Sequence, residues 1–131
     1  MNWIKWTLPL ILWTLLLLFL TWYPKVKTPD IGIEAQDKIA HLLFFLLWGL
    51  LMCRSHSKYE INRVPSAVKV TIIVGILFAI VDESMQELIP GRNFSIYDGL
   101  ANIMGVLMSI PFFLTIWLPR QGRSRIKQEK R

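Results

Sequence analysis

Four apolar blocks dominate the sequence, and each is long enough to cross a lipid bilayer as a helix. A span needs roughly 20 mostly apolar residues, because about 30 Å of hydrocarbon is crossed at about 1.5 Å per residue. The sequence therefore predicts an all-α membrane protein, a bundle of four transmembrane helices. We expect a single membrane domain over residues 1–119 and a basic tail over residues 120–131. The predicted helices cover about residues 4–23, 37–53, 67–89 and 97–118.

The first block fits either a cleaved signal peptide or an uncleaved signal-anchor helix. It has no small-x-small cleavage site, and it ends in the bulky sequence TWYPKVK. These features favour the uncleaved anchor. The single cysteine, Cys53, excludes an internal disulfide, and no CxxC pair or Cys/His cluster indicates structural zinc.

Lysine and arginine are unevenly divided between the two sides of the predicted bundle. Four spans put both termini on one side, and that side collects eleven of the fifteen basic residues, six of them in the tail. Cytoplasmic loops carry the excess of Lys and Arg, so we predict that both termini are cytoplasmic. The tail directly follows an apolar block. It therefore predicts contact with anionic lipid headgroups rather than with nucleic acid, despite the net charge of +6.

A strongly polar stretch separates the last two apolar blocks. Residues 82–102 read DESMQELIPGRNFSIYDGLAN. The helices on either side are antiparallel neighbours, so their polar ends lie at one depth, and the second block enters the same surface with Asp37 and His41. An ionised side chain at the bilayer centre costs at least about 2.5–3.5 kcal/mol. We therefore expect these groups to face one another, at the outer face of the membrane.

Residues four apart share a face of a helix, and the polar residues follow this spacing. Asp37 pairs with His41, Asp82 with Gln86, and Asp98 with Asn102. Small residues continue two of these faces. Gly75 and Ala79 on the third block allow a second helix to approach closely. Gly105 and Ser109 continue the face of Asp98 and Asn102 on the fourth.

Each polar residue also has a purely structural interpretation. Asp37 can cap the second helix, and Asp98 can cap the fourth, with Ser95 and Asn93 as rivals. The histidine can be a hydrogen-bonded packing residue. Arg92 can hold the turn by pairing with a neighbouring acid. The gathering of the whole set at one end of three helices favours a functional site over these separate roles.

The polar residues form an ordered series of four motifs. Residues 37–41 fit DKxxH, residues 82–86 fit DExxQ, residues 90–98 fit PGRxxSxxD, and residues 102–105 fit NxxG. In this order and spacing the series resembles the VanZ-like family, small bacterial membrane proteins named for a teicoplanin-resistance protein. Members often carry a tyrosine soon after the DKxxH histidine, whereas this chain has Phe44 and Phe45 there.

The resemblance implies a protein of the bacterial plasma membrane, with a cell-envelope role linked to tolerance of the glycopeptide teicoplanin and no settled biochemical activity. An anionic, lipid-linked envelope precursor or the glycopeptide itself is then the expected partner. The candidate acid–base residues are Glu83, His41 and Asp37. The candidate substrate-binding residues are Arg92, Gln86, Ser95, Asp98, Asn102 and Asp82.

Three classes of function stay open at this point. The first is a site that binds or processes the anionic substrate, in one variant through a divalent cation held by the acids and His41, although no motif is diagnostic of a metal. The second is a non-enzymatic scaffold or a protein that blocks antibiotic access. The third, ranked lowest, is a small transporter or channel, because the charged residues do not continue through the membrane.

Overall fold

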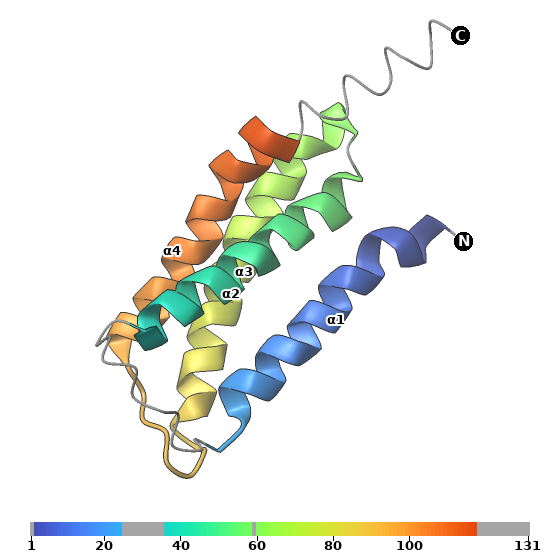
Figure 1. The fold of residues 1–131 in the computed structure, drawn as a ribbon. Helices are drawn as coiled ribbons and strands as arrows, with labels where there is room; N and C mark the ends of the chain where they lie inside the picture. The colour runs from blue at the N-terminus through green and yellow to red at the C-terminus, as the bar shows by residue number, and fades with distance from the viewer. Residues whose placement is uncertain (1, 25–35, 59, 118–131) are drawn as a thin grey trace, which may run out of the picture.

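The computed structural model describes residues 2–24, 36–58 and 60–117, and the described segments contain helices and no strand. Each of the four long helices is long and apolar enough to cross a membrane, which confirms the predicted all-α bundle of four spans (Figure 1). A short 3₁₀ turn, η1 (Ile61–Arg63), precedes the third helix, and a π-helical turn, η2 (Phe113–Trp117), follows the fourth. The long helices are α1 (Asn2–Trp22), α2 (Gln36–Ser57), α3 (Val64–Gln86) and α4 (Ile96–Phe112).

The helices run alternately up and down, so the bundle has two distinct ends (Figure 1). At one end α1 and α3 begin and α2 and α4 finish, and we call this the terminal end. At the other end α1 and α3 finish and α2 and α4 begin, and we call this the polar end. The membrane side that each end faces stays a prediction, and the basic tail lies outside the described residues.

Small residues bring α4 close to its neighbours at Gly105 and at Gly75, and the sequence predicts the close approach at Gly75. A Cβ atom added at Gly105 would collide with the carbonyl oxygen of Leu42 and lie 2.9 Å from the backbone nitrogen of Leu46. The α4 backbone therefore rests directly on the α2 backbone. The side chain of Val106 on α4 fills the space beside Gly75 of α3 that a Cβ atom would occupy. Close contact of this kind holds transmembrane helices together where water cannot drive association.

The helix α1 is more peripheral, since it packs against α2 and α3 and makes no comparable contact with α4 within the described residues. Two indole N–H groups fix it to α2. Trp13 Nε1 donates to the carbonyl oxygen of Phe44 at 3.0 Å, and Trp48 Nε1 donates to Thr14 Oγ1 at 3.0 Å. These bonds satisfy donors that lipid would leave unpaired, so they favour one placement of α1.

Helix ends differ from the predicted boundaries where local hydrogen bonds override the apolar pattern. The helix α2 continues past Cys53 to Ser57, and it closes when Lys58 adopts a left-handed conformation with φ of 47°. The helix α3 begins at Val64, because Pro65 stands in the first turn, where its missing N–H costs little. It ends at Gln86 rather than Ile89, and Gly91, with φ of 81°, turns the chain toward α4.

Candidate functional site

His41 lies one turn inside α2 and is buried, with 6% of its surface exposed. Its Nδ1 is 3.0 Å from Oδ1 of Asn102 on α4, which is completely buried. An amide oxygen only accepts hydrogen bonds, so with the carboxamide in this orientation Nδ1 carries the proton. Nε2 is then the nitrogen that remains for other chemistry. This contact joins α2 to α4 as the predicted faces require.

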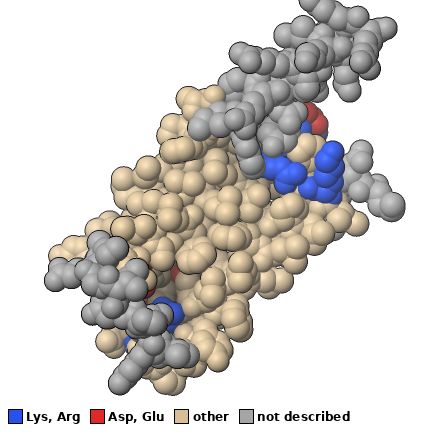
Figure 2. Space-filling view, in the orientation of Figure 1, with Lys and Arg blue, Asp and Glu red and all other residues tan. Residues whose placement is uncertain are grey.

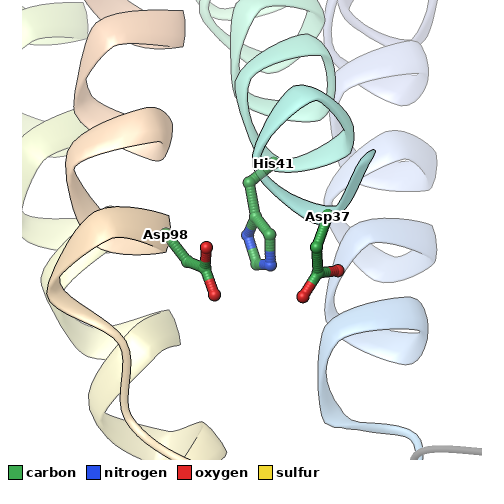
Figure 3. A group of neighbouring side chains, drawn as sticks. All are labelled: Asp37, His41 and Asp98. Atoms are coloured by element: carbon green, nitrogen blue, oxygen red, sulfur yellow. The ribbon is translucent and has the colours of Figure 1, made fainter. Parts of the chain in front are cut away.

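The His41 ring lies between two carboxylates, that of Asp37 on the same helix and that of Asp98 on α4 (Figure 3). One ligand atom from each of the three residues lies within 4.8 Å of the other two. Asp98 Oδ1 and Asn102 Nδ2 are buried without a hydrogen-bond partner in the described part of the chain, and Lys38 Nζ lies 4.0 Å from Asp98 Oδ1. We call Asp37, His41, Asp98 and Asn102 the histidine cluster.

The capping of α4 explains why the Asp98 carboxylate faces His41 and does not bond to the first turn of its own helix. Ser95 is the N-cap, and its Oγ accepts from the backbone N–H of Asp98 at 3.3 Å. The cap is therefore Ser95, and neither Asp98 nor Asn93 has that role. In a capping box the third helical residue accepts from the N-cap N–H. Here Glu83 of α3 accepts that bond at 2.8 Å instead, which leaves the Asp98 carboxylate to face His41.

The acids of α3 are buried and bound from several sides. Asp82 Oδ1 accepts from Thr21 Oγ1 at 2.7 Å and from Trp22 Nε1 at 3.1 Å, both on α1. Gln86 Nε2 lies 3.4 Å from Asp82 Oδ2 and 3.3 Å from Glu83 Oε2, so it donates to both carboxylates. Together with Arg92, these three residues of α3 form what we call the carboxylate network.

Arg92 connects this network to α1. Its Nη1 donates to Gln86 Oε1 at 3.1 Å, and its Nε and Nη2 donate to the carbonyl oxygens of Tyr23 and Leu20 at 3.2 and 3.0 Å. These carbonyls stand at the end of α1, where helical partners are missing. The guanidinium charge therefore lies over the negative end of the α1 dipole and fixes that end of the helix.

A cavity of about 70 Å³ joins the two groups of residues at the polar end. It is bounded by α1 and α2, and Asp37, His41 and Arg92 line it, whereas Asp82, Glu83 and Asp98 do not. A water molecule needs about 10–15 Å³ of such volume. The cavity thus has room for on the order of five waters, or for one group of similar size.

Sequence reasoning missed the contribution of α1 to this site. Thr21 and Trp22 supply two of the donors to Asp82, and Leu20 and Tyr23 supply carbonyl oxygens to Arg92. A signal was present, because Thr21 is a hydroxyl at the end of an apolar block, next to an indole N–H. Two donors at the membrane depth of buried acids predict a contact with those acids.

The histidine cluster could hold a metal ion. Its donor set is one imidazole nitrogen and two carboxylate groups, which suits Mn²⁺ or Zn²⁺ better than Ca²⁺. Ligands at about 2.0–2.2 Å from an ion lie at most about 4.4 Å from one another. The 4.8 Å limit of the cluster therefore requires only a small inward movement of the side chains. Asn102 fixes the ring through Nδ1, as outer partners of metal-bound histidines commonly do.

A family model described as VanZ/LLP1 matches residues 6–118. The chain belongs to the VanZ/LLP1 family. The match spans both the histidine cluster and the carboxylate network, and it agrees with the resemblance that the four motifs carry. The protein is accordingly a VanZ-like, multi-pass membrane protein of the cell envelope. No curated protein and no solved structure matches the chain.

Proposed function

We propose that this VanZ/LLP1 protein binds the phosphate-bearing end of a lipid-linked envelope substrate at the polar end, and that this binding lowers susceptibility to teicoplanin. The observation that carries the proposal is the His41 ring, held between two carboxylates and lining a cavity together with Arg92. The distribution of Lys and Arg supports an extracytoplasmic polar end, where such substrates are used. The link to teicoplanin rests on the family.

Charge decides which residues meet an anion. Five carboxylates of the described residues stand at the polar end, but of these only Asp37 lines the cavity, and Arg92 offsets its charge. A guanidinium has five N–H donors, and three of those of Arg92 bond within the protein. Two remain for a phosphate oxygen, and His41 adds a further donor when its ring is protonated on both nitrogens.

His41 is the group that we propose for proton transfer, because it is the titratable ring that the cavity reaches. Asp37 and Asp98 surround the ring, and Asn102 orients it. Glu83 is buried and accepts the N-cap N–H of α4, so we assign it a positioning role. Gln86 likewise positions Arg92, and Asp82 positions the end of α1.

A divalent cation within the histidine cluster would strengthen this binding. The surplus of carboxylates repels a phosphate, and an ion between Asp37, Asp98 and His41 would cancel that surplus and contact a phosphate oxygen directly. The unpartnered Oδ1 of Asp98 favours this variant, since a buried oxygen without a partner costs about 1–3 kcal/mol.

Binding of a polyprenyl phosphate to the purified protein in nanodiscs tests the proposal, with the uncharged polyprenol as the comparison lipid. We expect wild type to prefer the phosphate and His41→Gln to weaken that preference at least about tenfold, since one lost charged hydrogen bond is worth about 1.5–3 kcal/mol. Glu87→Gln is the matched control, because Glu87 is an exposed acid of the adjoining turn. Equal binding of the two lipids by wild type would refute the proposal.

A second candidate is a non-enzymatic scaffold, and the carboxylate network favours it. Asp82 accepts from two side chains of α1, and Glu83 accepts the N-cap N–H of α4, so both acids fix one helix against another. If the polar end serves only this purpose, conservative replacements in both groups of residues lower the amount of folded protein and leave phosphate preference intact. Comparing folded yield with binding for His41→Gln and Glu83→Gln separates the two candidates.

A further inference from the structure

A second and larger cavity lies at the terminal end, away from the residues discussed above. Its volume is about 370 Å³, within the range of about 300–1,000 Å³ that is typical of small-molecule sites. It opens between α1, α2 and η1. The stretch of α2 from Asp37 to Met52 separates it from the polar end by roughly 20 Å. The lining residues are Thr7, Leu10, Met52, Ser55, His56, Lys58 and Arg63.

The lining changes from apolar to charged toward the end of the bundle. Leu10 and Met52 lie about one helical turn deeper along their helices than Thr7 and Ser55, whose hydroxyls are 3.4 Å apart. The cationic residues, Lys58 and Arg63, stand beyond both pairs. The cavity therefore has an apolar floor, a hydroxyl-bearing middle and a basic rim, which is the polarity of a membrane lipid near its headgroup.

Positive charge exceeds negative charge around this cavity. Lys5 and Arg54 add to Lys58 and Arg63, whereas the acid here is Glu60, which lies 2.6 Å from Arg63 Nε. Four cations thus meet one carboxylate in this part of the described chain. Figure 2 shows basic side chains gathered at the same end of the molecule. Arg54 stacks over the ring of Trp6, with its guanidinium carbon 5.0 Å from the ring centroid, as interfacial residues do.

The backbone at Lys58 supports a role for its side chain. This residue closes α2 with φ of 47°, and its N–H bonds to the Arg54 carbonyl oxygen at 3.0 Å. Helices commonly close in this left-handed conformation with glycine, which lacks the steric penalty that a Cβ atom brings. A lysine at this position is therefore strained relative to a glycine. Its side chain places a cation at the rim of the cavity.

We propose that this cavity binds the phosphate group of an anionic membrane lipid. Lys58 and Arg63 contact the phosphate, the hydroxyls of Thr7 and Ser55 face the glycerol region, and an acyl chain lies over Leu10 and Met52. Basic pockets between transmembrane helices recognise lipid phosphates in this way. The proposal does not depend on the function assigned to the polar end, and it holds for either orientation in the membrane.

Thermal unfolding of the purified full chain in detergent tests this site. Phosphatidylglycerol is added in one arm, phosphatidylcholine with the same acyl chains in a second, and inorganic phosphate in a third. At a saturating concentration we expect phosphatidylglycerol to raise the Tm of wild type by roughly 5–10 °C more than phosphatidylcholine does. Lys58→Gly removes the cation and also relieves the backbone, so it should fold well and lose this increment.

Lys69→Gln is the matched control, because Lys69 is an exposed cation near the start of α3 that does not line the cavity. It should keep the full increment. Equal effects of the two lipids on wild type would overturn the proposal, and so would a loss with Lys69→Gln as large as that with Lys58→Gly. The same Lys58-dependent increment from inorganic phosphate alone would show a site for a free ion and overturn the lipid assignment.

Discussion

Gly105 is the position at which one added carbon should do most harm to the bundle. It lies where the α4 backbone rests on α2, one turn after Asn102, which holds His41. In Gly105→Ala, the new methyl group would collide with the carbonyl oxygen of Leu42 and lie 3.1 Å from the Cβ atom of Phe45. Two of its three nearest neighbours are backbone atoms, so no side-chain rotation relieves the contact.

The size of the effect follows from the separation that the methyl group demands. The two helices must move apart by on the order of 1 Å, and a gap of that size forfeits a quarter to a half of the dispersion energy of the contacts it opens. Overpacking of this kind costs about 1–3 kcal/mol. Alanine returns up to about 1 kcal/mol through its higher helix propensity. Because the new atom meets rigid backbone, the cost belongs in the upper part of that range, and the net loss is about 1–2 kcal/mol, a factor of roughly 5–30 in the folding equilibrium.

Unfolding from mild detergent into sodium dodecyl sulfate, followed by tryptophan fluorescence, measures this loss. Gly99→Ala is the control on the same helix, because a Cβ atom there meets the Glu83 side chain at an ordinary 3.7 Å. We expect that variant to be neutral or more stable than wild type. If the two variants agree within about 0.5 kcal/mol, then the close approach of α4 to α2 is not what stabilises the bundle.

Three further predictions concern the polar end. Asp82→Asn replaces one of the two carboxylate oxygens that accept from three donors, so it should lower the free energy of unfolding by about 1–3 kcal/mol. Ser84→Ala, which removes an exposed hydroxyl nearby on α3, should leave that free energy unchanged, and an equal loss in both variants would contradict the role assigned to Asp82. Arg92→Lys keeps the charge, but an ammonium group cannot bond to two α1 carbonyls and the Gln86 amide at once. Backbone amide hydrogen exchange should accelerate in the last turn of α1 alone, and an equal acceleration across the bundle would count against the role of Arg92 in fixing that turn. Metal analysis of protein purified without chelator should find about one divalent ion per chain in wild type and none in Asp98→Asn; a metal-free wild type would remove the cation from the proposed mechanism.

Much of the fold follows from one physical constraint that the sequence displays directly. Polar groups are costly in hydrocarbon, so the ends of the apolar blocks locate the helices, and acids inside those blocks must meet one another. This reasoning correctly predicts four spans, the close helix approach at Gly75, and the shared end of the polar residues. Each of these depends on hydropathy and helical periodicity, which neighbouring residues determine.

The pairing of individual groups could not be predicted, because it depends on angles between helices that periodicity does not contain. Nothing in the spacing assigns the N-cap N–H of α4 to Glu83, or gives His41 an amide partner on another helix. The same holds for Arg92, whose nearest acids in the sequence are not its partners. Helix ends also escaped prediction, since α2 outlasts its apolar run through polar contacts with α1.

The most direct test of the account is teicoplanin susceptibility in a sensitive Gram-positive host, at matched membrane levels of each variant. The account predicts that wild type raises tolerance, that His41→Gln abolishes the gain while still inserting, and that Glu87→Gln, at an exposed acid of the same end, preserves it. Tolerance that is equal in all three proteins would contradict the central claim, because the histidine cluster would then have no part in what the protein does.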